Sequence, residues 1–364
     1  MTVATSSCNR ALRKTFFSVT ILPVLLTALA FGCKSNEYTS LSDLLSRHPA
    51  NRLENWQTQF QQRQGQWPQD FVQSGKGLPL EYARDMNLMD GYPPPRPARL
   101  APWQLAEYRS SLLLALESKP ELRNFLTRRV AGIYLVEDLG SSGLTGFIYD
   151  SEGVARAGFI LLDIHRVELR ASEMINLREK TLIKNAEELP ADWGYRLQCN
   201  YDCDAPGSAL NLLLFHESAH VASEVYRLLP SLLVSRKEYE ASSASLPEPW
   251  NHYWSSPWET RPFGEVRPIL QFYGDRPDST SDKHQEGVRD SFKQGFPGTY
   301  SLLDVWEHMA EVTAYGMSDT VLVFSDGKGH SYSISVSDRP DYAAFLRDLQ
   351  KRMGEDSGIG EVKP

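Results

Sequence analysis

The sequence predicts an α+β fold, in which a mixed β-sheet is followed by a long apolar helix and then by a mainly helical part. Three observations support this fold class. Segments rich in β-branched and aromatic residues, separated by turn residues, lie between residues 130 and 164. Residues 211–229 contain neither glycine nor proline, and Pro230 ends that stretch. Residues 304–315 form a second stretch of the same kind.

The composition is that of a globular protein. The chain has 364 residues, of which 41% are hydrophobic and 23% charged, enough for one large domain or two modest ones. Its formal net charge of −8 argues against a nucleic acid as the partner. We expect residues 101–364 to form the main domain, with a long insertion at residues 231–299.

Residues 1–32 resemble the signal peptide of a bacterial lipoprotein. Three basic residues precede an apolar run from Phe16 to Phe31, which is of signal-peptide length and short for a membrane span. Small and apolar residues, ending in Gly32, then stand before Cys33. The resemblance implies cleavage before Cys33 and lipidation of that residue, which would anchor the chain to a membrane of the bacterial cell envelope. The alternatives are an uncleaved anchor and an ordinary secretory signal.

Residues 33–100 are expected to form a tether and an N-terminal extension. Residues 34–50 look like a tether, and residues 51–100 are rich in glutamine and proline, with a stiff break at residues 93–97. The predicted helices and strands of the main domain follow in chain order. They are helices at 102–117 and 119–129, strands at 130–138, 144–149 and 158–164, a strand at 331–336 and a helix at 342–352.

Two cysteines remain outside the export segment. In an exported protein, Cys199 and Cys203 are expected to close a small disulfide loop around residues 200–202. Metal binding is the alternative for this pair, but the chain has no second pair to complete a tetrahedral site.

Residues 216–220 read His-Glu-Ser-Ala-His, within the first glycine- and proline-free stretch. His216 and His220 are four residues apart, so a helix places both on one face, where they can bind one cation. Glu217 projects beside them, where it can take a proton from a metal-bound water. Two nitrogens, a third protein ligand and a water make up a catalytic zinc site. The alternative is a pair of core histidines satisfied by hydrogen bonds.

A third ligand is expected from the second stretch, where Glu307 and Glu311 share a helix face. One carboxylate can bind the metal, and the other can accept the free N–H of a ligating histidine. His308 is a rival ligand, but it points away from the two glutamates. A solvated face with two carboxylates is the alternative reading.

The pairing of H-E-x-x-H with a downstream Glu-x-x-x-Glu helix resembles the gluzincin metallopeptidases, the clan of thermolysin. The resemblance implies Zn²⁺ as the cofactor, Glu307 as the third ligand and Glu311 as the acid that supports a ligand histidine. Glu224 matches an acid at that position in thermolysin-like and lethal-factor-like enzymes. Tyr300, seven residues before Glu307, resembles the lethal-factor-like branch and implies a hydroxyl that stabilises the oxyanion. The alternative is a tyrosine that packs at the helix entrance.

In these enzymes an edge strand lies above the metal and pairs with the extended substrate. Residues 158–164 are the candidate for that strand, with an ordinary core strand as the alternative. The expected function is therefore that of a zinc-dependent metallopeptidase, lipid-anchored through Cys33, with a peptide or protein as its substrate.

A different class of function is a surface lipoprotein that binds a partner through the insertion and keeps a structural or inactive zinc site. The insertion carries aromatic residues that either line a cleft or form a satellite core beneath a long loop. These are Trp250, Tyr253, Trp254, Trp258, Phe272 and Tyr273.

Overall fold

The computed structural model describes residues 38–63, 66–199, 203–233, 250, 272–273, 277 and 279–359. Residues 36–364 form one compact unit. The tether expected for residues 34–50 therefore ends earlier than predicted, because helix α1 (Leu41–Arg47) already buries Leu44 and Leu45. The signal peptide and Cys33 lie outside the described residues.

The main sheet is mixed, as the sequence predicts. Its strands are β1 (Val72–Ser74), β2 (Arg96–Pro97), β3 (Val130–Glu137), β4 (Gly143–Tyr149) and β5 (Ala155–Asp163). They lie in the order β1-β3-β5-β4, and β2 pairs with the end of β3. The pairs β1–β3 and β3–β5 are parallel, whereas β4 runs antiparallel to β5. The short β1 shows that the N-terminal extension belongs to the same sheet as the main domain.

Both faces of this sheet are buried. Ile133, Leu135 and Leu162 face one hydrophobic cluster, and their neighbours Tyr134 and Leu161 face the other. The alternation follows from the two-residue repeat of a strand. Because both faces need apolar side chains, these strands read as nearly continuous apolar runs.

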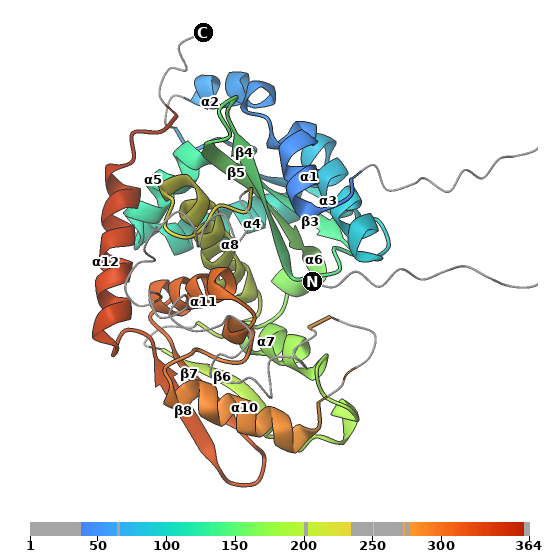
Figure 1. Ribbon diagram of the computed structural model, residues 1–364, viewed down its shortest axis with the longest axis vertical. Helices are drawn as coiled ribbons and strands as arrows, with labels where there is room; N and C mark the ends of the chain where they lie inside the picture. The colour runs from blue at the N-terminus through green and yellow to red at the C-terminus, as the bar shows by residue number, and fades with distance from the viewer. Residues whose placement is uncertain are drawn as a thin grey trace, which may run out of the picture. The chain divides into compact units, whose positions relative to one another are not determined.

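Helices cover the two faces (Figure 1). The N-terminal elements on one side are α1, two 3₁₀ turns (Pro49–Asn51 and Leu53–Asn55), α2 (Gln57–Arg63) and α3 (Gly77–Asp90). The other side holds α4 (Pro102–Glu117), α5 (Pro120–Arg129), α6 (Ile164–Val167) and α8 (Ala209–Tyr226), and α7 (Ala171–Lys180) packs against α8. The helices expected at 102–117 and 119–129 are confirmed as α4 and α5.

A second, smaller sheet is antiparallel, and two of its three strands come from the C-terminal part of the chain. The sequence did not predict these strands as one sheet. The sheet has the order β6-β7-β8, with β6 (Gly194–Gln198), β7 (Val321–Ser325) and β8 (Ser331–Ser335). The remaining elements are 3₁₀ turns at Ala186–Glu188 and Tyr300–Leu302 and helices α10 (Ser281–Lys293), α11 (Val305–Met317) and α12 (Pro340–Glu355). Cys199 and Cys203 form the predicted disulfide at the end of β6.

The prediction that residues 158–164 form the edge strand is wrong. They belong to β5, which lies between β3 and β4. The two end strands of this order are β1 and β4. Part of the outer edge of β4 is covered, because Asn51 donates to the Phe147 carbonyl and Arg52 bridges to Tyr149. Among the described residues, these contacts leave the first half of β4 as the uncovered part of that edge.

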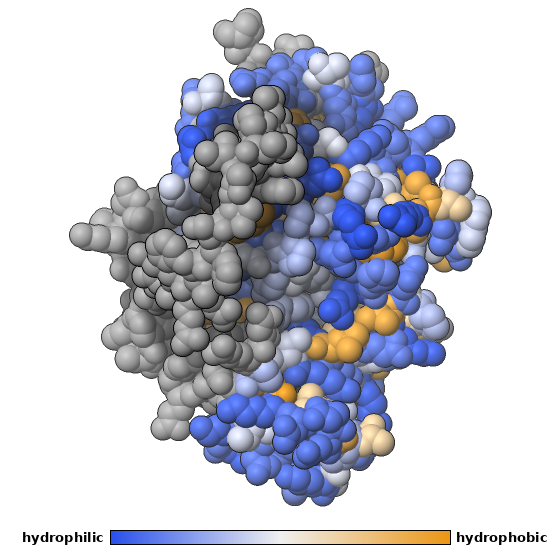
Figure 2. Space-filling view, turned by 90° about the vertical axis from the view of Figure 1, so that its right-hand side faces the viewer, coloured by the Kyte–Doolittle hydropathy of each residue, from blue (hydrophilic) through white to orange (hydrophobic). Residues whose placement is uncertain are grey.

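The surface seen in Figure 2 is mostly hydrophilic, with small separate apolar patches. Within the described part of the chain, no helix is long and apolar enough to span a membrane.

Candidate metal centre

Helix α8 places His216 and His220 side by side on the same face. Their Nε2 atoms are 3.2 Å apart. The helix runs without interruption from Ala209 and ends at Tyr226, where Arg227 takes the left-handed conformation. The four-residue spacing of the motif therefore produces the juxtaposition that the sequence predicts.

Helix α11 brings a carboxylate to the same place. Asp304 caps the helix by accepting a hydrogen bond from the Glu307 backbone N–H at 2.9 Å, which fixes the first turn. Glu307 Oε2 then lies 3.1 Å from His216 Nε2 and 3.7 Å from His220 Nε2. One ligand atom from each of these residues lies within 4.8 Å of the others.

This arrangement fits a zinc ion. Bonds of about 2.0–2.1 Å in tetrahedral geometry place the ligand atoms about 3.3 Å apart. The separations of 3.1, 3.2 and 3.7 Å among the three donors bracket that value. Two imidazole nitrogens and one carboxylate oxygen also form a donor set that zinc favours.

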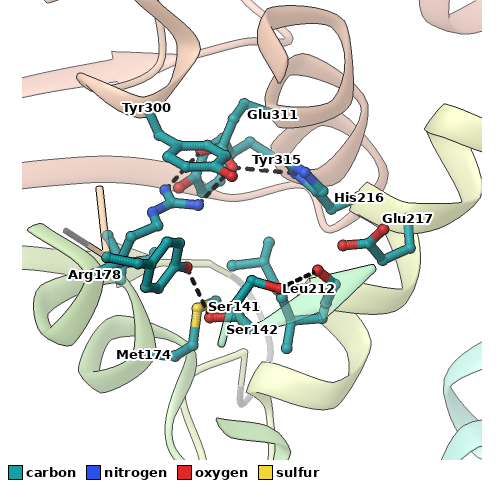
Figure 3. A pocket seen from close by; sticks show the side chains of 14 residues that line it. Ser141, Ser142, Met174, Arg178, Leu212, His216, Glu217, Tyr300, Glu311 and Tyr315 are labelled. Atoms are coloured by element: carbon teal, nitrogen blue, oxygen red, sulfur yellow. Dashed lines mark hydrogen bonds and ion pairs between the residues drawn. The ribbon is translucent and has the colours of Figure 1, made fainter. Parts of the chain in front are cut away.

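Glu311 supports His216 from the side opposite Glu307. Its Oε1 lies 3.2 Å from His216 Nδ1, so the ring can donate there while Nε2 faces the cluster. Arg178 of α7 donates to both carboxylate oxygens of Glu311, at 3.1 and 3.2 Å. Both side chains are about 95% buried. Figure 3 shows Arg178, Glu311 and His216 in one chain of contacts.

Burial and charge set the protonation of this cluster. Burial by itself lowers the pKa of His216, but its hydrogen bonds to Glu307 and Glu311 raise the pKa to about 10. Burial also opposes ionisation of both glutamates. The pKa of Glu307 is nevertheless lowered by His220 and His216, and that of Glu311 by Arg178 and His216. Without a metal, both carboxyls are therefore anionic at neutral pH and His216 is protonated, so an ion bound by Nε2 would displace a proton from this imidazole.

Figure 3 shows Glu217 beside His216. Its carboxylate is held by β4. Thr145 of β4 donates to Glu217 Oε2 at 2.6 Å. The other oxygen, Oε1, lies so close to Gly143 that a Cβ there would be 2.2 Å from it. A side chain at this position would therefore displace the Glu217 carboxylate.

Tyr300 opens the 3₁₀ turn that leads into α11. Its ring lies 6.0 Å from the His216 ring, and the Arg178 guanidinium carbon lies 3.8 Å from its ring centre. Burial, aided by the charge of Glu307, raises the pKa of Tyr300 well above its ordinary value. The phenol therefore stays protonated and can act as a donor.

Glu224 does not lie at the cluster, contrary to expectation. Its carboxylate accepts hydrogen bonds from the Tyr149 hydroxyl at 3.0 Å and from Ser231. Glu224 therefore links α8 to the end of β4, and it supports neither His216 nor His220. Burial raises the pKa of this carboxyl.

His308 is not a ligand either. It points into a separate aromatic cluster, where Nδ1 accepts from Trp250 at 3.1 Å and Nε2 lies 2.9 Å from the Tyr342 hydroxyl. Trp250 is fully buried, so this aromatic residue of the insertion packs in the core. Tyr253, Trp254 and Trp258 lie outside the described residues.

A small cavity, about 30 Å³, adjoins the cluster. Arg178 and Thr145 are site residues that the sequence did not predict, because their partners lie 133 and 72 residues away in the chain. Tyr273 is one of the insertion aromatics that the sequence left open as cleft residues, and it lines the cavity. The cavity is lined by Ser141, Ser142, Gly143, Met174, Ile175, Arg178, Leu212, Leu213, His216, Glu217, Tyr273, Tyr300, Glu311 and Tyr315.

Comparison with known proteins gives no relative: no family model, no curated protein and no solved structure matches this chain. The function must therefore be inferred from the site itself.

Proposed function

We propose that this protein is a zinc-dependent metallopeptidase. The observation that carries the proposal is the cluster of His216, His220 and Glu307, with Glu311 behind one histidine and Glu217 beside it. Three protein ligands leave a tetrahedral ion one open position, which is the arrangement of catalytic rather than structural zinc. Zinc held there would supply Lewis acidity towards the carbonyl of the scissile bond.

Glu217 is the general base in this proposal. Thr145 fixes one of its carboxylate oxygens, so the other can take a proton from the attacking water and pass it to the leaving amine. The hydrogen bond also prevents the carboxylate from rotating away from the reacting atoms, which preserves the geometry that the proton transfer requires.

Tyr300 is the second catalytic residue. Its protonated phenol would donate a hydrogen bond to the oxyanion that develops on the scissile carbonyl. Arg178 acts by positioning: its guanidinium packs against the Tyr300 ring and holds Glu311 in place against His216.

The uncovered first half of β4 is the surface on which an extended peptide would lie. Edge strands offer backbone donors and acceptors to such a chain. Gly143 and Thr145, which flank Glu217, stand on this half. A peptide bond beside them would face the proposed base, so the substrate class that fits is a peptide or an extended segment of a protein.

The place of action follows from the N-terminal sequence. The lipobox-like segment before Cys33 supports a lipoprotein, anchored to a membrane of the bacterial cell envelope. The disulfide between Cys199 and Cys203 is in keeping with an oxidising compartment outside the cytoplasm.

The experiment that tests the function compares wild type with Glu217→Gln on a peptide library, with zinc measured in the same samples. The substitution keeps the size of the side chain and removes its basicity. We expect about one zinc per chain in both proteins and cleavage by wild type alone. Equal cleavage by the variant would disprove the role of Glu217.

A further inference from the structure

Tyr273 lies at the candidate catalytic centre, although the sequence places it in the insertion. It lines the same cavity as His216 and Glu217. Its hydroxyl lies 3.0 Å from the Ser142 Oγ, directly before the start of β4. The preceding residue, Phe272, packs its ring 4.9 Å from the Tyr300 ring.

The backbone of Tyr273 is fixed by two further elements. Its N–H donates to the Thr181 hydroxyl at 3.0 Å, at the end of α7. Its carbonyl accepts from the Tyr92 hydroxyl at 3.0 Å, in the segment after α3. With the contact to Ser142, three separate parts of the fold hold this residue.

Tyr273 also adopts a left-handed backbone conformation, with φ of +61°. A bulky residue rarely does so, because its side chain is sterically strained there. Such strain persists where the surroundings fix the residue, as the three hydrogen bonds do here. In this conformation the Tyr273 ring lies against the candidate catalytic centre.

The ring leaves little space. The remaining cavity, about 30 Å³, has room for one or two waters or a group of similar size. A hydrogen, a methyl or a hydroxymethyl group fits such a space, whereas an isobutyl or benzyl group does not.

This inference rests on the proposed function. We propose that Tyr273 determines the substrate specificity of the peptidase, by restricting one residue next to the scissile bond to glycine, alanine or serine. Glu217 acts on the scissile bond and faces Gly143. A peptide that lies along β4 continues from there past Ser142 and Ser141, where Tyr273 fills the space for the neighbouring side chain.

Binding of zinc-chelating amino-acid hydroxamates tests this without relying on catalysis. Zinc-loaded full-length protein is titrated with glycine hydroxamate and with leucine hydroxamate by calorimetry. We expect wild type to bind the glycine compound at least ~10-fold more tightly, since a side chain too large for its pocket costs that much or more. Tyr273→Gly should abolish or reverse the preference, and glycine accepts the backbone conformation at this position.

Tyr273→Phe is the matched control. It keeps the ring and loses only the hydroxyl, so it should retain the preference for the glycine compound. The peptide library should show the same pattern, with small residues at one flanking position for wild type and larger ones accepted by Tyr273→Gly. If the protein binds zinc but wild type binds both hydroxamates with equal affinity, this inference alone is overturned. It is also overturned alone if Tyr273→Gly keeps the wild-type ratio of the two affinities. Absence of zinc from the purified protein overturns the proposed function and this inference together.

Discussion

Arg178 donates two hydrogen bonds to Glu311, at 3.1 and 3.2 Å, and Glu311 in turn lies 3.2 Å from His216 Nδ1. A buried arginine thereby acts on a proposed metal ligand, His216, that it does not touch. The arrangement holds the carboxylate ionised and the imidazole in the orientation that turns Nε2 towards His220 and Glu307.

Arg178→Met should weaken zinc binding by about 10–100-fold, the usual effect of losing a group that orients a ligand. It should also lower the free energy of unfolding by about 3–5 kcal/mol, because the buried carboxylate of Glu311 loses its arginine partner. Competition with a zinc chelator and urea unfolding measure the two effects.

The double variant Arg178→Met/Glu311→Gln separates them. It also removes the buried charge of Glu311, so it should recover much of the lost stability while zinc affinity stays low. Arg352→Met, which breaks an exposed pair with Asp348, should change neither quantity appreciably. Unchanged zinc affinity in Arg178→Met would contradict the positioning role.

Thr145→Val should reduce kcat by about 10-fold or more, because a hydrogen bond to a charged group contributes about 1.5–3 kcal/mol. The zinc content should not change, since Thr145 contacts Glu217 and no ligand. Thr145→Ser keeps the hydroxyl and should remain close to wild type in steady-state kinetics. A valine variant with the kcat of wild type would contradict this role of the hydrogen bond.

Gly143→Ala should also lower kcat with zinc retained, because its Cβ would stand 2.2 Å from Glu217 Oε1. We expect a loss of at least ~10-fold, as small displacements of a catalytic group have large effects. If the loss acts through Glu217, Gly143→Ala should have no further effect in a Glu217→Gln background. An additional loss there would mean that the alanine disturbs something else, such as peptide binding on β4.

The stability of the fold should fall in acid through Asp356. Burial by itself would raise the pKa of this carboxyl, but hydrogen bonds from Arg129 and Tyr226 lower it below its ordinary value. A carboxyl with a lowered pKa stabilises the fold fully above its unfolded pKa, about 3.9 for aspartate, and the contribution is lost as the pH falls below that.

Asp356→Asn should therefore be less stable than wild type at pH 7 and should lose less stability on acidification to pH 3. Urea unfolding across this range measures both. Parallel acid slopes for the two proteins would show that Asp356 does not carry the effect.

Much of the fold and the core of the site could be predicted because their patterns are local. The four-residue spacing of His216 and His220, and of Glu307 and Glu311, is enough to place each pair on one helix face. That the two helices meet was inferred from a resemblance, and the 3.1 Å separation of His216 and Glu307 agrees with it.

The errors and omissions concern pairing over long distances in the chain. The order of strands depends on which strand lies beside which, and a local pattern does not give the neighbours of a strand. The unbroken apolar run of β5 is typical of an internal strand, and the structure places β5 between β3 and β4. Glu224 has the right spacing for the cluster but faces Tyr149. Tyr273 reaches the site from a loop-rich insertion, where periodicity carries no information.

The most direct test of the central claim is a zinc titration of metal-free protein followed by peptide hydrolysis. The account predicts that wild-type activity rises with added zinc and saturates at about one zinc per chain, whereas Glu217→Gln binds zinc without gaining activity and His220→Ala gains neither. Hydrolysis that is independent of zinc, or equal in wild type and Glu217→Gln at saturation, would contradict it.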